Sequence, residues 1–170
     1  MNAMLTLPAP LWRRLMSAVY DGLLLAALWL AAVGVEEAVR LIAHLDRNTI
    51  ALRLYLLVVG LGFFGWFWTR GGRSPGMSAW RLQLRRADGY PPGWPSAAIR
   101  YLAMLGCWAL CLAPPTALLL PAAQFPNRFA AAAGAAVLAA LCLLSTLMDG
   151  RRRAPHDRLS GTEVVLLPRG

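Results

Sequence analysis

Acidic residues, histidines and cysteines are scarce in this sequence, and their scarcity excludes several kinds of site. Two histidines cannot supply a metal-dependent phosphohydrolase centre, although His156 and Asp157 are adjacent. The three cysteines all fall inside long apolar stretches, where they behave as small apolar residues. Phosphate-binding loops, nucleophile–base arrangements and paired catalytic carboxylates are missing as well. We therefore expect a protein that is not an enzyme and that holds no metal and no cofactor.

Positive charge greatly exceeds negative charge, with 17 basic residues, 8 acidic residues and a formal net charge of +9. In a soluble protein such an excess would make nucleic-acid binding a candidate function. The base-stacking modules and zinc-finger spacings of nucleic-acid-binding proteins do not accompany the charge here. We therefore expect no nucleic-acid partner.

Apolar residues make up 58% of the chain and are concentrated in four blocks, residues 15–35, 50–69, 99–120 and 129–148. Each block is close to the ~20 residues that cross ~30 Å of hydrocarbon as a helix. The rest of the chain is too short to cover four such helices in water. The pattern predicts a single domain, residues 1–170, of the all-α membrane class: a four-transmembrane-helix bundle.

The arginines are distributed unequally between the two sides of such a bundle. If the chain crosses the membrane four times, both termini lie on one side. Only Arg40, Arg47, Arg53 and Arg128 then lie on the other side, and all other arginines lie on the same side as the termini. By the positive-inside rule, the N-terminus, the loop 70–98 and the tail 149–170 are then cytoplasmic, and the membrane is a bacterial inner membrane. Glu36–Thr49 forms the external loop of this topology.

Arginines beside an anionic bilayer surface anchor their segments by about 1 kcal/mol each. We expect the cytoplasmic arginines to contact lipid headgroups, a partner protein in the membrane or a second copy of the chain. The residues expected in this contact are Arg13, Arg73, Arg81, Arg85, Arg86, Arg151, Arg152 and Arg153.

Small residues and prolines give two further expectations about the helices. Ala18, Gly22 and Ala26 recur every fourth residue, and such a stripe lets a second helix approach closely in lipid. Pro114 and Pro115 remove backbone donors from the third apolar block, so we expect the helix to kink or end there.

Two short segments on the cytoplasmic side have the pattern of strands. Apolar and polar residues alternate over Trp80–Leu84, and Val164–Leu167 is a second apolar run with β-branched residues. Because neither strand is stable alone in water, we expect them to pair, antiparallel or parallel, in a short β-hairpin-like element. The pairing would bring Asp157 within reach of Arg14 or of the loop arginines.

Asp21 lies inside the first apolar block, where a carboxylate costs about 2.5 to 3.5 kcal/mol on insertion scales. Arg14 shares its helix face but lies ~10 Å away along the axis, so we do not expect the two to pair directly. A partner on another helix, a water-filled cleft or protonation would each compensate Asp21. Its role is then to order the bundle through hydrogen bonds or to carry a proton or cation, unless it lies shallow enough to reach the surface.

Asp149 and Asp157 flank the triple arginine 151–153 at the end of the fourth block. Ion pairing at the headgroup surface is the ordinary role of such residues, and we expect it of both aspartates.

Four segments together resemble the RDD family of membrane proteins. Leu-Trp-Arg-Arg-Leu-Met-Ser-Ala-Val-Tyr-Asp at 11–21 is similar to the opening of that family, and Gly72–Gly76 with Trp80–Gly89 is similar to its glycine-flanked loop and short strand. Ala97–Arg100 resembles the arginine that opens the family's next helix. The segment from Pro155-His156-Asp157 to Val164-Val165 resembles its closing motif, so the likeness covers essentially 11–165.

The family is named for one arginine and two aspartates, and the resemblance places them in this sequence. The arginine falls on Arg14, with Arg13 beside it, and the first aspartate falls on Asp21. The second aspartate is Asp157 or, alternatively, Asp149. The sequence departs from the family in its loop, where Met77 stands in place of the usual basic residue.

Two hypotheses of function follow from the residues and the resemblance. The first is a non-enzymatic membrane module whose arginine-rich cytoplasmic face binds lipid headgroups or a partner. The second is a small ion-coupled transporter or cation/proton exchanger that uses Asp21, in line with the general suggestion that RDD proteins transport a ligand. A transporter of four helices would need to oligomerise to enclose a pathway.

Overall fold

The computed structural model describes residues 7–119, 127–150 and 153–168, so Arg151 and Arg152 lie outside the described residues. Four helices in this part of the chain are long and apolar enough to cross a membrane, which confirms the four predicted spans. They are α1 (Leu11–Ile42), α2 (Thr49–Gly71), α4 (Trp94–Leu119) and α5 (Arg128–Met148).

The first helix is longer than predicted, because α1 continues to Ile42 through residues that we had assigned to an external loop. Arg40 and Glu37 form an ion pair one turn apart, and such pairs support a helix outside the hydrocarbon. The turn before α2 is correspondingly short. Asn48 caps α2 by accepting hydrogen bonds from the backbone N–H groups of Ile50 and Ala51, at 3.1 and 3.0 Å.

The third predicted span is also continuous across its two prolines. Pro114 and Pro115 lie inside α4, which ends at Leu119, so the alternative that the helix ends at the prolines is wrong. The hydroxyl of Thr116 donates to the carbonyl of Leu112 at 2.8 Å, one turn back. Side-chain bonds of this kind are among the means by which membrane helices tolerate proline.

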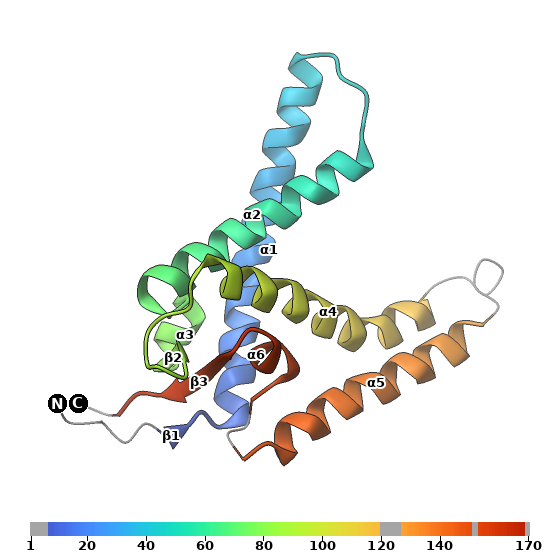
Figure 1. Ribbon diagram of the computed structural model, residues 1–170. Helices are drawn as coiled ribbons and strands as arrows, with labels where there is room; N and C mark the ends of the chain where they lie inside the picture. Colours follow the sequence, from blue (N-terminus) through green and yellow to red (C-terminus); the bar gives the residue numbers. More distant parts are fainter. Residues whose placement is uncertain (1–6, 120–126, 151–152, 169–170) are drawn as a thin grey trace.

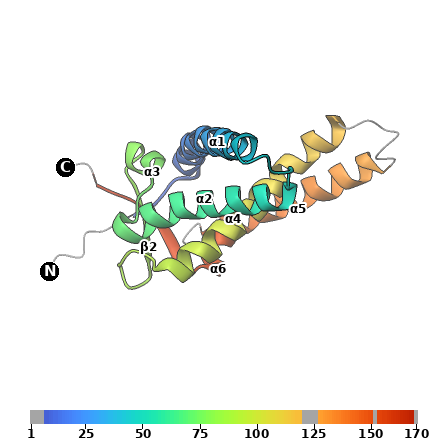
Figure 2. The same cartoon turned by 90° about the horizontal axis from the view of Figure 1, so that it is seen from above.

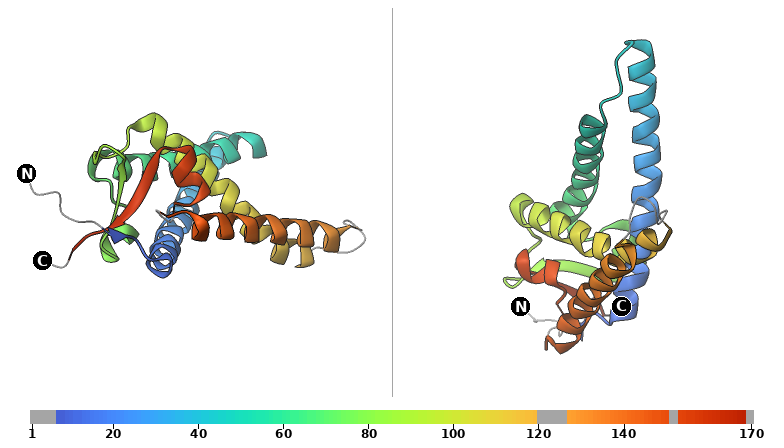
Figure 3. Two further views of the ribbon diagram at one scale, coloured as in Figure 1. Left: turned by 60° about the horizontal axis from the view of Figure 1, so that its bottom comes forward. Right: turned by 90° about the vertical axis from the view of Figure 1, so that its right-hand side faces the viewer.

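The long helices form two hairpins that diverge from one end of the molecule. Figures 1 and 3 show the α1–α2 hairpin and the α4–α5 hairpin extending in different directions. Figure 2 shows α2 beside α4, and these two helices make the contact that joins the hairpins. Gly22 lies against the outer edge of the Trp108 ring on α4, where an added Cβ would lie 3.0 Å from the nearest ring carbon. Gly22 therefore gives room to a side chain of α4, and the close approach of a second helix along the stripe stays a prediction.

A three-stranded antiparallel sheet lies at the end where the hairpins meet. Its order is β1-β3-β2, formed by β1 (Leu7–Pro8), β2 (Leu82–Arg86) and β3 (Thr162–Leu166). The predicted pairing of loop and tail is confirmed as antiparallel, with Gln83 opposite Val165. The N-terminal strand was not predicted. The sheet gathers the start of the chain, the loop and the tail at one end of the protein.

The core is concentrated at the same end. Phe64 and Trp68 of α2 stack with ring centres 4.8 Å apart, and Tyr101 of α4 packs beside Phe64. Leu84 and Val164 close this cluster from the sheet. Two short helices, α3 (Pro75–Ala79) and α6 (Pro155–Leu159), connect the spans to the sheet.

We predict that a cysteine at position 83 will form a disulfide with a cysteine at position 165, in a variant without Cys107, Cys111 and Cys142, because the two Cα positions are partners in the ladder. Mass spectrometry of peptides after mild oxidation measures the link. The matched control pairs position 83 with position 163, which lies two residues away in the register and should link far more slowly. Equal linking of both pairs would contradict the antiparallel register.

Candidate functional site

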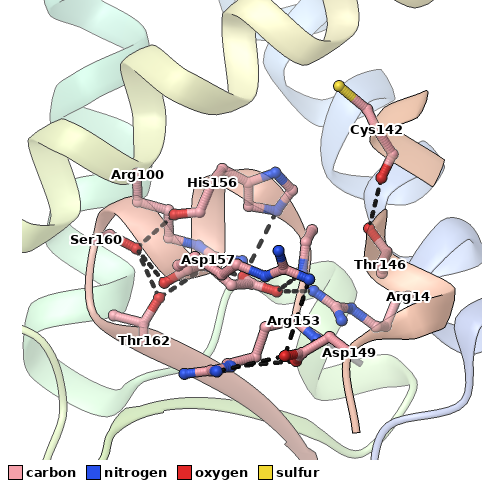
Figure 4. Close-up of polar contacts among 12 residues, drawn as sticks. Arg14, Arg100, Cys142, Thr146, Asp149, Arg153, His156, Asp157, Ser160 and Thr162 are labelled. Carbon is pink, nitrogen blue, oxygen red and sulfur yellow. Dashed lines mark hydrogen bonds and ion pairs between the residues drawn. The ribbon is translucent and has the colours of Figure 1, made fainter. Parts of the chain in front are cut away.

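Asp157 lies at the centre of a buried ion-pair cluster that joins three helices (Figure 4). Its carboxylate accepts hydrogen bonds from Arg14 of α1 and Arg100 of α4, and the Asp157 side chain is fully buried. The backbone N–H of Ala154 donates to the same carboxylate at 2.9 Å, which fixes the first turn of α6. The predicted approach of Asp157 to Arg14 is confirmed. The prediction of a surface ion pair for Asp157 is wrong, because its side chain is fully buried and pairs with Arg14 and Arg100, which lie on spanning helices.

Arg100 is the second cation of this cluster and was not among the predicted site residues. The same Nη1 atom donates to Asp157 and to the hydroxyl of Thr162 at 3.0 Å, so Arg100 contacts the tail on both sides of its turn. Its guanidinium carbon lies 5.1 Å from the ring centre of Trp68. The sequence carried one signal for this role, the arginine that opens a helix in the family resemblance.

The charges around Asp157 control the protonation of the cluster. Burial alone would raise the pKa of the Asp157 carboxyl, but Arg100 and Arg14 more than offset it and hold that pKa well below its ordinary value. His156 Nε2 lies 3.6 Å from Asp157 Oδ1. Burial, together with the positive charge of Arg100, lowers the pKa of His156 from 6.5 to about 3. The cluster at neutral pH is therefore one carboxylate, two guanidiniums and a neutral imidazole.

Asp21 forms a second buried contact, between α1 and the loop. One carboxylate oxygen accepts from the Ser74 hydroxyl and the other accepts from the Gly76 backbone N–H at 2.8 Å. Of the alternatives that the sequence left open, the structure shows a partner on another helix, and that helix is α3. Position 76 has no room for a larger residue than glycine, because an added Cβ would lie 2.5 Å from the Ser17 carbonyl oxygen. Both oxygens of the carboxylate are thus occupied.

Asp149 is the alternative second aspartate, and it lies apart from these contacts at the end of α5. It accepts hydrogen bonds from Arg153, with Arg153 Nε 3.2 Å from Asp149 Oδ2, and Arg158 lies 3.8 Å away. The hydrogen bond from the Arg153 side chain lowers the pKa of Asp149 to about 2. The predicted ion pairing is confirmed for Asp149.

The arginines predicted to contact headgroups divide into two groups. Arg85 pairs with Glu163 across the sheet at 2.9 Å, Arg86 pairs with Asp88, and Arg153 pairs with Asp149. Arg73 and Arg81 are exposed, and Arg13 is half-buried with its guanidinium carbon 5.2 Å from the ring centre of Trp12. Among the described residues, no group of three His, Cys, Asp or Glu side chains is placed to hold a metal ion.

We predict that Asp157→Asn will lower the free energy of unfolding by about 3 to 5 kcal/mol, because it leaves the buried Arg100 without its counter-charge. Chemical denaturation in detergent micelles measures the loss. Asp149→Asn is the control, with a much smaller effect because its partners are more exposed. The double variant Asp157→Leu, Arg100→Met should recover part of the stability. Equal losses at positions 157 and 149 would contradict the buried ion pair.

We also predict that stability falls as the pH falls below 6.5. The pKa of His156 is lower in the folded protein, so the unfolded chain binds more protons between pH 6.5 and 3. Above pH 6.5 His156 is neutral in both the folded and the unfolded protein, so it does not lower the free energy of unfolding. Below pH 6.5 the free energy of unfolding falls by up to ~1.4 kcal/mol per pH unit. Unfolding free energies at pH 7.5 and 5.5 should differ by about 1 kcal/mol in the wild type and clearly less in His156→Gln. The same difference in both proteins would exclude His156 as the cause.

The searches of curated proteins and of solved structures found no match. The sequence model of the RDD family matches residues 8–161, a range that begins before α1, includes Arg14, Arg100 and Asp157, and ends where the tail enters β3. Because this match covers most of the chain, the protein is a member of the RDD family.

Proposed function

We propose that this protein is a non-enzymatic module of a bacterial inner membrane whose arginine-rich cytoplasmic face binds anionic lipid headgroups. The sheet supports the topology, because β1, β2 and β3 place the N-terminal segment, the loop and the tail at one end of the spans. The positive-inside rule assigns that end to the cytoplasm, since most of the arginines belong to these segments.

The observation that carries the proposal is a difference in burial between acidic and basic side chains at this end. Asp21 and Asp157 are buried, and both are engaged by partners within the chain. Arg73 and Arg81, in contrast, are exposed beside the sheet. Asp88 of the loop is exposed as well, but it pairs with Arg86. The net charge of these exposed side chains is therefore positive, and its counterpart in a membrane is the phosphate of an anionic lipid.

The alternative is a small ion-coupled transporter or cation/proton exchanger that uses Asp21. The burial of Asp21 within a spanning helix is the observation that favours it. Transport would require the carboxylate to release Ser74 and Gly76 whenever a proton or cation arrives. The contacts of Asp21 fit better with a structural role, in which the carboxylate holds α3 against α1.

We predict that the purified protein binds phosphatidylglycerol in preference to phosphatidylcholine, because each arginine near an anionic headgroup contributes about 1 kcal/mol. Native mass spectrometry after titration with each lipid measures the number bound and the affinity. The preference should weaken when the salt concentration of the titration is raised from 0.05 to 0.5 M, since salt screens exposed charges. Equal binding of the two lipids at low salt would contradict the proposal.

The same protein in liposomes with an internal pH-sensitive dye separates the two functions. The membrane module should show no cation-driven change in pH. Exchange in the wild type that disappears in Asp21→Asn, while that variant still inserts at normal levels, would establish the transporter instead. Asn keeps one acceptor oxygen for the Gly76 N–H, so the loop contact survives in part. Asp21→Leu leaves the buried N–H of Gly76 unpaired, which should cost about 1 to 3 kcal/mol.

A further inference from the structure

The short helix α3 lies along the first part of α1 and runs in the opposite direction. Ser74, at the start of α3, contacts Asp21, and Gly76 lies against the Ser17 carbonyl. Trp80, at the end of α3, reaches Trp12 near the start of α1. At 1.5 Å per residue, the Trp12–Trp80 contact is ~14 Å from Asp21 along the α1 axis. The loop therefore covers the cytoplasmic end of α1 from the depth of Asp21 outward.

Trp12 and Trp80 form an aromatic pair at this outer end. Their rings pack edge to face with centres 5.5 Å apart, and Trp12 remains 53% exposed. Tryptophan favours the level of the headgroups in a bilayer, because its ring is amphipathic. The pair marks the height at which α1 and the loop meet the lipid phosphates.

Each tryptophan is followed directly by an arginine. Arg13 lies over the Trp12 ring, and its Nε atom is buried with no hydrogen-bond partner among the described residues. Arg81 is exposed, and none of the ion pairs among the described residues involves its side chain. The sequence thus adds a cation next to each ring of the aromatic pair at the predicted headgroup level. The acidic residues nearest to them in sequence are Asp21, which accepts a hydrogen bond from Ser74, and Asp88, which pairs with Arg86.

The backbone of Arg81 is also unusual. Its φ of 57° lies in the left-handed region, which favours glycine and asparagine, and its carbonyl accepts from the Leu167 N–H at 2.9 Å. The turn between α3 and β2 thus requires a left-handed residue, and the protein has a long cation there. Glycine would satisfy the backbone, but it would remove the guanidinium from the headgroup level.

We propose that Trp12, Arg13, Trp80 and Arg81 form a binding site for the phosphate of an anionic phospholipid. The two guanidiniums donate to the phosphate oxygens, and the paired indole rings lie against the glycerol and the upper acyl chains. This site rests on the proposed function and deepens it, because it assigns headgroup recognition to the junction of α1 and α3 and not to the arginine-rich face as a whole.

Arg81→Gly tests the site with little risk to folding, because glycine adopts the left-handed conformation without cost. We expect its melting temperature in detergent to equal or exceed that of the wild type. Its affinity for phosphatidylglycerol, measured by native mass spectrometry, should fall about fivefold, and that of the double variant Arg13→Gln, Arg81→Gly about 30-fold. Arg81→Lys should retain most of the affinity. The control Arg47→Gln, Arg53→Gln removes the same charge from the opposite end of the spans.

The outcomes separate the site from the function on which it rests. Wild-type protein without any preference for phosphatidylglycerol would contradict the proposed function and the site together. A preference that survives in the Arg13→Gln, Arg81→Gly variant would overturn the site alone, and so would an equal loss in the control. Competition with glycerol 3-phosphate identifies the source of the phosphate. Displacement of the lipid by equal concentrations of this soluble compound would overturn the assignment to a membrane lipid, and its failure to displace the lipid supports it.

Discussion

The buried pairing of Asp157 with Arg14 and Arg100 is the interaction on which the end of this protein that carries the sheet depends. Burial of an isolated charge costs several kcal/mol, so each member of the cluster requires the others. The three side chains come from the tail, α1 and α4, which are distant in sequence. A single carboxylate thus determines where the tail leaves the membrane and how close the two hairpins lie at their common end. Arg100 also donates a hydrogen bond to Thr162, the first residue of β3, and so helps to fix where that strand begins.

The first helix supplies a polar group to the loop and another to the tail. Arg14 binds the tail through Asp157, and Asp21, two turns further along, binds the loop through Ser74 and Gly76. Pairing of β2 with β3 then joins the loop to the tail. Loop, tail and α1 are therefore connected in a closed ring of polar contacts. Loss of one contact leaves the other two in place but removes the constraint that aligns them.

Much of this arrangement follows from local pattern, and the remainder depends on contacts between distant residues. The lengths of the apolar blocks predicted the four spans. Alternation in the loop, together with the β-branched apolar run in the tail, predicted the paired strands. The predicted end of α1 is too early because the apolar block ends at residue 35 and Glu36–Thr49 is assigned to a loop, although the pairing of Glu37 with Arg40 supports a helix there. Arg100 looked like one more cytoplasmic arginine, because nothing in its neighbourhood of the sequence shows that Asp157 is buried against it. The partner of Asp21 was left open for the same reason, since Ser74 and Gly76 reach it only after α3 folds back along α1.

The separation in sequence between these partners imposes an order on biosynthesis. Arg14 precedes Asp157 by 143 residues and Arg100 precedes it by 57. At roughly 5 to 20 residues per second, Arg14 is made some 7 to 30 seconds before its counter-charge. All four spans leave the ribosome before the tail, so the hairpins enter the bilayer before the cluster can form. Asp157 and the strand β3 that follows it therefore complete the assembly of helices that are already in the membrane.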